Sequence, residues 1–296
     1  MRQLWDSAAA LLIVTGGLLG MIFPLGKIAT GAGVSAVVWS FVISFGVGTI
    51  LILVQIVRRD FPQLDRHKLR YFAIAGAISY AIPNIIVFAA IPHLGAGFTA
   101  IMLTLSPVIT LTLSLLIGLR RPSPLGIAGI AVGFVGAVIV AATRGELGQP
   151  AALGWVALGL LIPVALAIGN IYRTIDWPAH AGPIELAIGS HYAAAVILLL
   201  VGLVPAANFD LAPLADLPLA VVAQAASSAG MFVFFFRLQA VGGPVYLSQI
   251  GYVAAAVGLV SGTLFLGERY ALLTWAGAAT VGIGVVMTTK AQSRES

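Results

Sequence analysis

Residues 94–119 read LGAGFTAIMLTLSPVITLTLSLLIGL and contain no Asp, Glu, Lys or Arg. An α-helix rises about 1.5 Å per residue, so about 20 apolar residues cross the hydrocarbon core of a bilayer. That core holds no water to hydrogen-bond the backbone, so a segment that spans it must be helical. The stretch therefore predicts a transmembrane helix.

Nine further stretches share this property, and each of the ten is 20 to 30 residues long. The composition agrees, because 60% of the 296 residues are hydrophobic and only 8% are charged, whereas a soluble domain carries about 25% charged residues. We predict an all-α integral membrane protein with ten transmembrane helices. The ten stretches are residues 7–26, 28–57, 71–92, 94–119, 122–143, 147–172, 186–209, 217–236, 238–267 and 270–289.

The Lys and Arg residues predict the orientation in the membrane. With ten spans and a cytoplasmic N-terminus, twelve of them fall on the cytoplasmic side and three outside, which is the positive-inside bias. Both termini should face the cytoplasm, in the cell (inner) membrane, and the net charge of +5 reflects topology rather than a nucleic-acid partner. The first stretch could be a signal peptide, but its length and this charge balance favour a retained span. The cytoplasmic set is Arg2, Arg58, Arg59, Arg66, Lys68, Arg70, Arg120, Arg121, Arg173, Arg237, Lys290 and Arg294, and the outer set is Lys27, Arg144 and Arg269.

The second half of the chain matches the first at a shift of 148 or 149 residues. Each half holds five spans, an odd number, so the second copy must enter the membrane in the opposite sense. Inverted repeats of this kind are common in transporters, where the substrate site lies between the halves. We expect two inverted five-helix repeats, residues 1–148 and 149–296, although duplication retained only for packing is the alternative. The matching glycine pairs are Gly95/Gly243, Gly129/Gly277 and Gly136/Gly284.

Several short motifs resemble the EamA-type proteins of the drug/metabolite transporter superfamily, which have two five-span repeats. This resemblance implies metabolite transport, often export, through a central cavity lined by spans 1–4 and 6–9, with spans 5 and 10 at the periphery. Two positions depart from the family pattern: Arg120 stands where the second half has Glu268, and Trp39 stands where many relatives carry an arginine. The motifs are Leu238–Gly243, Leu264–Glu268, Trp275, Gly277 and Gly284 in the second half, and Leu105–Pro107, Gly129 and Gly136 in the first.

Polar side chains inside the spans are candidates for the substrate site, because burying them costs free energy unless they are paired or face water. Tyr80 and Asn84 share a helix face beside Pro83, which leaves the carbonyl of Ser79 without its helical donor. For Asn84, a bridge between two helices is an equally good interpretation. Trp39 and other deep aromatics could also be interface anchors, but their depth favours a cavity. The predicted substrate-binding residues are Trp39, Tyr80, Asn84, Asn170, Gln224, Ser228, Ser248, Gln249 and Tyr252.

Two ionisable residues are candidates for proton coupling. His191 lies deep in its span, and its unperturbed pKa near 6.5 suits a proton-sensitive group, although a structural histidine is equally compatible. Glu185 is the second candidate, but its position near a helix end favours contact with water. Lys27 is expected to reach the lipid headgroups, with contact to a substrate carboxylate as the alternative. Glu268 and Arg269 are expected to form a helix cap and an exposed ion pair.

The sequence does not favour an enzyme. The ten acids are scattered, the four histidines are isolated, there are no cysteines, and no phosphate-binding loop occurs, so no cofactor or metal is expected. We predict a transporter that moves small metabolites, such as amino acids or related compounds, by alternating access and in the export direction. A lipid-processing membrane enzyme without a recognisable motif is the alternative. The expected partners are the small-molecule substrate and the bilayer, not nucleic acid, and a homodimer is left open.

Overall fold

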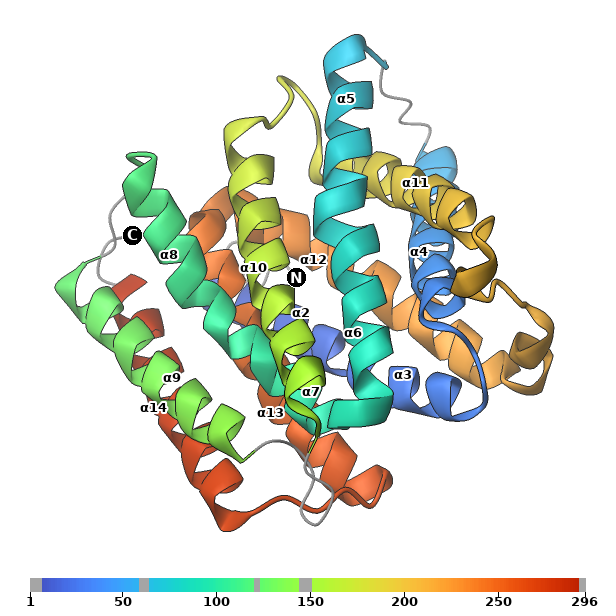
Figure 1. Cartoon of the computed structure of the whole chain (residues 1–296). Helices are drawn as coiled ribbons and strands as arrows, with labels where there is room; N and C mark the ends of the chain where they lie inside the picture. The colour runs from blue at the N-terminus through green and yellow to red at the C-terminus, as the bar shows by residue number, and fades with distance from the viewer. Residues whose placement is uncertain (1–6, 59–63, 120–122, 144–150, 293–296) are drawn as a thin grey trace.

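The computed structural model, which describes residues 7–58, 64–119, 123–143 and 151–292, is an all-helical bundle (Figure 1). Within these ranges there is no β-strand. The longer helices are α2 Ala8–Gly20, α3 Ile22–Gly31, α4 Ala36–Arg58, α5 Arg66–Ala75, α6 Ile82–Leu94, α7 Ala96–Met102, α8 Ser106–Leu116, α9 Pro124–Ala142, α10 Leu153–Ile175, α11 Pro183–Gly202, α12 Pro218–Ser248, α13 Ile250–Phe265 and α14 Leu272–Gln292.

In the described part of the chain, seven helical segments are long and apolar enough to cross a membrane, and three further apolar helices are shorter. Each of these ten segments overlaps one of the ten uncharged stretches of the sequence. The all-α membrane class is thus confirmed, while the count of ten spans stays a prediction. The seven are Ala8–Gly31, Ala36–Val57, Arg66–Leu94, Ala96–Leu116, Leu153–Ile175, Pro183–Gly202 and Pro218–Ser248, and the shorter three are Pro124–Val140, Ile250–Phe265 and Leu272–Thr288.

Two glycines interrupt the helices at matching places in the two halves. Gly95 (φ 81°, ψ 159°) separates α6 from α7, and Gly243 (φ 71°, ψ −179°) breaks α12 just before Pro244. This backbone region is essentially restricted to glycine. Two further glycines with positive φ, Gly118 and Gly267, follow α8 and α13. Both pairs are separated by the 148 or 149 residues at which the halves match in sequence, so the halves share their backbone breaks.

Irregular helical turns occur in the middle of the bundle. A π-helical turn, η1 (Gly76–Ala81), joins α5 to α6 and precedes Pro83, and a 3₁₀ turn, η2 (Leu103–Leu105), joins α7 to α8 just before Pro107. Prolines inside helices remove backbone hydrogen bonds, and single π-helical turns occur frequently at functional sites. The sequence therefore weakens these helices at the level where the central cavity lies.

Helices α9 and α14 form an antiparallel pair at one side of the molecule (Figure 1). A Cβ at Gly129 would lie 2.9 Å from the carbonyl oxygen of Gly284, and a Cβ at Gly136 would lie 2.6 Å from that of Gly277. The close approach of the two backbones therefore depends on glycine, as small residues commonly allow between membrane helices. The peripheral position of the pair agrees with what the family resemblance implies for spans 5 and 10.

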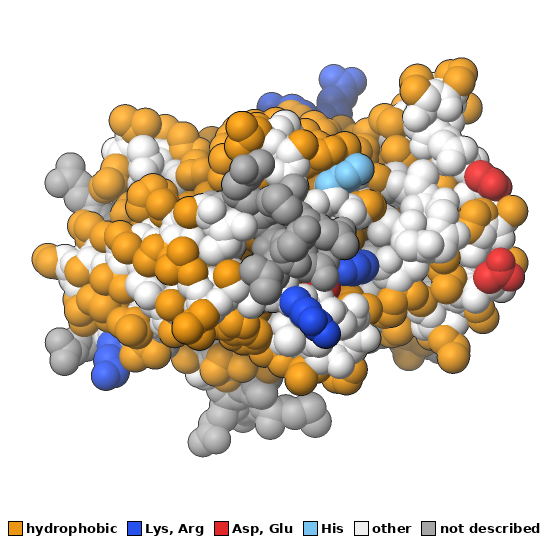
Figure 2. Space-filling view, turned by 60° about the horizontal axis from the view of Figure 1, so that its bottom comes forward, with side chains coloured by type: hydrophobic (Ala, Val, Ile, Leu, Met, Phe, Trp, Pro, Cys, Tyr) orange, Lys and Arg blue, Asp and Glu red, His pale blue; other side chains and the backbone are white. Residues whose placement is uncertain are grey.

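The outer surface of the bundle is apolar. Leu116, Leu200, Leu219 and Phe265 are each at least 60% exposed. Figure 2 shows hydrophobic side chains over most of one face, with few charged groups between them. An exposed apolar surface of this extent fits a multi-pass membrane protein, whose lipid-facing side chains do not need to be polar.

A central cavity as the candidate substrate site

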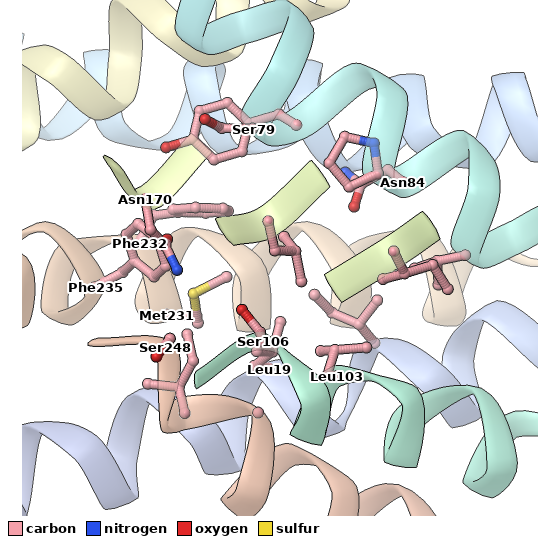
Figure 3. Close-up of a pocket in the computed structure, with 18 of the residues that line it drawn as sticks. Leu19, Ser79, Asn84, Leu103, Ser106, Asn170, Met231, Phe232, Phe235 and Ser248 are labelled. Atoms are coloured by element: carbon pink, nitrogen blue, oxygen red, sulfur yellow. The ribbon is translucent and has the colours of Figure 1, made fainter. Parts of the chain in front are cut away.

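A cavity of about 80 Å³ lies where the irregular helices meet (Figure 3). Its walls come from α2, α3, α4, η1, α6, η2 and α8 in the first half, and from α10, α12 and α13 in the second. None of the residues that line it belongs to α9 or α14. The cavity is therefore formed jointly by the two halves.

Four of the predicted substrate-binding residues line this cavity: Tyr80, Asn84, Asn170 and Ser248. Figure 3 shows Asn84 and Ser79 on one side and Asn170, Ser248 and Ser106 on the others. The rest of the wall is mainly apolar, with Met231, Phe232 and Phe235 from α12 and Leu103 from η2. The cavity thus combines a few neutral polar groups with a larger apolar and aromatic surface, which is typical of small-molecule sites.

Arg173 also lines the cavity, although the sequence interpretation placed it among the cytoplasmic charges. Its side chain is almost completely buried, with 2% exposed, so it is not a surface charge. Its Nε donates to Gln239 Oε1 at 3.0 Å, and its Nη2 donates to Asn170 Oδ1 at 2.6 Å. The guanidinium lies 4.9 Å from the ring centroid of Phe235 and 5.7 Å from that of Tyr80. The only sequence signal for this position was Asn170, one turn earlier on α10.

Five predicted substrate-binding residues do not line the central cavity. Gln224 and Ser228 are fully buried and hydrogen-bond each other at 2.8 Å along α12. Trp39 is also fully buried, and its indole N–H has no hydrogen-bond partner among the described residues. Tyr252 packs over Gly133 of α9, where a Cβ would approach the Tyr252 hydroxyl to 2.6 Å. Gln249 accepts a hydrogen bond from Thr288 and faces a second cavity.

The two coupling candidates lie in different environments. His191 stacks on Tyr80, with ring centroids 4.3 Å apart, and meets Phe232 edge-on at 4.1 Å. Because both rings line the cavity, His191 lies directly behind the cavity wall, and its ring nitrogens have no hydrogen-bond partner in the described chain. Glu185 does not reach water as expected. It is buried, pairs with Lys68 at 2.7 Å and accepts from the backbone N–H of Gly182 at the start of α11.

A second, larger cavity of about 300 Å³ surrounds the break at Gly243. Thr174 and Gln249 line it, while their chain neighbours Arg173 and Ser248 line the central cavity. Gln239 links residues on the two cavity walls. Its amide donates to Thr174 Oγ1 at 3.1 Å and to the carbonyl of Asn170. A hydrogen-bonded partition of Arg173, Gln239 and Asn170 therefore lies between the two cavities.

Glu268 lies beside the other helix break, at Gly95, and contacts the start of α7. Its carboxylate is 1% exposed and accepts from the backbone N–H groups of Ala96 at 2.7 Å and Gly97 at 3.1 Å. It also accepts from the Lys27 ammonium and the Tyr270 hydroxyl. We call this cluster of Lys27, Ala96, Gly97, Glu268 and Tyr270 the Glu268 lock. The expected exposed ion pair of Glu268 and the expected headgroup contact of Lys27 are both wrong.

The environment of the lock favours the ionised carboxylate. Burial by itself would raise the pKa of Glu268, but the hydrogen bonds from Lys27, Tyr270, Ala96 and Gly97 outweigh it and hold the pKa below its usual value. Burial and the adjacent carboxylate raise the pKa of Tyr270, which therefore stays a neutral donor. Arg269 next to them is exposed. The lock is thus a buried anion with four donors from three separate segments of the chain.

Metal binding has no evident place in the part of the chain that the structure describes, since no three His, Asp or Glu side chains gather there. The chemistry on the cavity wall is instead hydrogen bonding by neutral groups and by one guanidinium. Such a wall can bind a small molecule, but it offers no evident pair of groups for acid–base or nucleophilic catalysis.

Comparison with known proteins agrees with the family resemblance. Residues 7–142 match the model of the EamA-like transporter family. This match falls on the first half, whereas the motifs quoted above are clearest in the second. The comparison with curated proteins gives no match. A solved crystal structure, described only as that of a protein, is similar over 96% of this chain and 98% of its own, with a TM-score of 0.68 and 18% sequence identity. At that identity the similarity concerns the fold alone.

Proposed function

We propose that this chain, whose first half matches the EamA-like transporter family, carries small metabolites across the cell membrane through the central cavity. The observation that supports this most is the composition of the cavity wall, which takes helices from both halves of an apolar-surfaced bundle. A site between two halves can be exposed to either side of the membrane when the halves change their relative position. The substrates we propose are amino acids or related compounds, moved in the export direction.

The proposed mechanism is alternating access between two inverted five-helix repeats, residues 1–148 and 149–296, with ten spans. Support comes from the α9–α14 contact, where Gly129 meets Gly284 and Gly277 meets Gly136. Under the shift of 148 residues the first pair maps onto the second, as a two-fold relation between the halves requires. The boundary between the repeats, at 148 and 149, falls outside the described residues.

In this proposal the Glu268 lock closes the outer end of the cavity, and the Gly243 cavity lies toward the cytoplasm. The orientation follows from the positive-inside bias and places both termini in the cytoplasm. Part of its basis, the cations Arg2, Arg59, Arg120, Arg121, Arg144 and Arg294, lies outside the described residues. The structure would then represent a state closed to the outside, with the Arg173 partition separating substrate from the inner cavity.

Proton coupling remains part of the proposal through His191. The titratable and charged groups nearest to its ring are Tyr80, which stacks on it, and Arg173, which lies over the other part of the same wall. We expect His191→Gln to abolish any dependence of transport on a proton gradient. Unchanged pH dependence in that variant would exclude this role and leave the transport proposal intact. Glu185, paired with Lys68, is the second candidate.

The test is reconstitution into proteoliposomes with a panel of labelled amino acids, organic acids, amines, sugars and nucleosides, measured for uptake and efflux with and without a pH gradient. Ser106 and Thr112 offer a matched pair of variants on α8. Ser106 faces the central cavity, whereas Thr112 is exposed on the outside of the bundle. Ser106→Leu should reduce transport at least tenfold by occupying the cavity, and Thr112→Leu should leave it nearly unchanged.

Two outcomes would count against the proposal. The first is that no compound of the panel moves through folded wild-type protein. The second is that Ser106→Leu and Thr112→Leu have equal effects, which would mean that transport does not use this cavity. Thermal unfolding in detergent shows whether both variants retain the wild-type fold.

A further inference from the structure

The charge of Arg173 has no anionic partner in the described structure. The hydrogen-bond acceptors of its guanidinium are the neutral amides of Gln239 and Asn170. Among the residues that the structure describes, no carboxylate oxygen lies within 4.0 Å of it, since the ion pairs there involve Lys27, His67, Lys68 and Arg70. A buried charge without a counter-charge is costly, and inside membrane spans such groups mark substrate pathways. Arg173 therefore needs an explanation beyond packing.

The guanidinium also has donor capacity left. It carries five N–H groups in a planar fork, of which two are accounted for by Gln239 and Asn170. Arg173 lines the central cavity, so the remaining donors are available to a molecule within it. The fork matches the two oxygens of a carboxylate, and such paired hydrogen bonds are among the stronger ones in proteins.

Other unsatisfied donors line the same cavity. The hydroxyl groups of Ser79, Tyr80 and Ser106 are buried and have no hydrogen-bond partner among the described residues. These three hydroxyls on one cavity wall are free to donate to an occupant that accepts hydrogen bonds. Phe235 and Tyr80 flank the guanidinium with their rings and hold it in place without neutralising it.

We infer that Arg173 binds the carboxylate of the transported molecule, so that the substrate is a small organic acid with an apolar body. This inference rests on the proposed function and specifies its substrate class. The apolar body lies against Met231, Phe232 and Leu103. The cavity volume of about 80 Å³ holds about five to eight water-sized groups at roughly 10–15 Å³ each, which sets the size of the molecule. Both an amino acid and the corresponding 2-oxo acid present this carboxylate.

The experiment uses sets of three labelled compounds of equal size: an amino acid, its amide and its 2-oxo acid, with the side chains of alanine, valine and phenylalanine. The full-length protein in proteoliposomes should move the acids of at least one set at least tenfold faster than the amide, because only the acids carry a carboxylate. Arg173→Gln should reduce transport of the acids about tenfold to hundredfold and leave that of the amide unchanged or increased. Arg173→Lys should recover part of the loss.

Arg70→Gln is the matched control, since Arg70 is exposed at the same end of the bundle and pairs with Asp176. It should change neither the rate nor the preference for acids. Transport of the amino acid without the 2-oxo acid identifies an added requirement for the amino group, and transport of both identifies the carboxylate as sufficient; either result supports the inference.

Equal transport of acid and amide by the wild-type protein overturns the inference, and this measurement does not depend on the folding of any variant. An unchanged acid preference in folded Arg173→Gln overturns it as well. Transport of only sugars, nucleosides or amines from the wider panel also excludes the carboxylate anchor but retains the transporter. Failure of every compound is different, because it removes the proposed function itself.

Discussion

The helix breaks at Gly95 and Gly243 have similar backbone conformations, but the polar groups around them differ. At one end Gly95 precedes α7, and at the other Gly243 precedes Pro244, both with positive φ and extended ψ. The Gly95 end carries the Glu268 lock, in which one carboxylate accepts hydrogen bonds from two backbone N–H groups. The Gly243 end has no such carboxylate among the described residues and opens into a cavity of about 300 Å³.

The sequence explains why the lock is not duplicated. The position that matches Ala96 is Pro244, which has no backbone N–H to donate. The position that matches Glu268 is Arg120, which lies outside the described residues and whose side chain has no acceptor. The two matching helix breaks therefore differ, because only the one at Gly95 has a buried carboxylate bound to the following backbone N–H groups. We expect the two ends to respond differently to the same kind of change.

The largest difference is expected when the acid of the lock is removed. Glu268→Ala leaves the donors of Lys27, Tyr270, Ala96 and Gly97 without their acceptor. Breaking a buried ion pair costs roughly 3–5 kcal/mol, and because 30% of the Lys27 side chain is exposed we expect about 3 kcal/mol, or about a hundredfold more opening. The chain has no cysteine, so labelling of Thr99→Cys, one turn inside the lock, with an impermeant maleimide measures that opening.

Arg269→Ala serves as the control for this experiment. Arg269 adjoins Glu268 in sequence but is exposed, so its removal should change the labelling rate of Thr99→Cys less than twofold. Equal labelling in Glu268→Ala and Arg269→Ala would show that the lock does not close this end.

The two glycines give a smaller and directly matched comparison. Alanine at either position is strained by about 1–3 kcal/mol, because the backbone conformation is essentially restricted to glycine. At Gly95 a Cβ would also lie 3.1 Å from Glu268 Oε1 and 3.3 Å from the Tyr270 hydroxyl, whereas at Gly243 it would meet nothing within 4 Å. Both variants should lower the melting temperature, Gly95→Ala more, and only Gly95→Ala should increase labelling of Thr99→Cys. The same labelling in both would remove the distinction between the ends.

A change of pH should have the smallest effect on opening at the Glu268 lock within the range above about pH 5. The lowered pKa of Glu268 means that its contribution to closure is complete above the usual carboxyl value of 4.5 and is lost only as the pH falls through the lowered value. Maleimide reacts with the thiolate, so labelling of Thr99→Cys is divided at each pH by that of an exposed reference cysteine, Arg269→Cys. This ratio should be constant from about pH 5 to 8 and rise at more acidic pH. Glu268→Gln should no longer show this rise.

Asp176 provides the comparison at the other end. Burial raises the pKa of its carboxyl, but hydrogen bonds from Tyr172 and His67 and the charge of Arg70 outweigh this, so the net pKa is lowered. Asp176→Asn should leave the acid-dependent labelling of Thr99→Cys intact, because Asp176 does not belong to the lock. Loss of the acid response in Asp176→Asn would indicate that the two ends are coupled.

The helical class follows from the sequence because the bilayer imposes simple rules on length and polarity. The cavity residues Tyr80, Asn84, Asn170 and Ser248 could also be chosen in advance, since polar groups deep in spans need partners or water. Gln224 and Ser228 meet the same criterion but hydrogen-bond each other away from the cavity, while Gln224 Oε1 has no partner among the described residues. A polar residue in a span therefore predicts that the side chain is buried in the bundle. The sequence does not specify whether that side chain faces the cavity or a neighbouring helix.

The charged residues were harder to predict, because their positions near helix ends suggested contact with water. Arg173 is instead turned into the bundle, and Glu268 reaches Ala96 and Gly97, which are far away in sequence. A side chain at a helix end can extend toward solvent or into the interior, and only the three-dimensional packing decides between them. For this reason the sequence placed Arg173 and Glu268 in more exposed surroundings than the structure does.

The unbalanced charge of Arg173 has an electrical consequence. An empty cavity carries one positive charge at the site. A bound 2-oxo acid, with one negative charge, makes the site neutral, whereas a zwitterionic amino acid leaves its charge at +1. A membrane potential of 100 mV acts on one elementary charge with about 2.3 kcal/mol when that charge crosses the whole field. In the proposed transport cycle, voltage should therefore bias the return of the empty carrier and leave the step that moves a bound 2-oxo acid nearly unaffected.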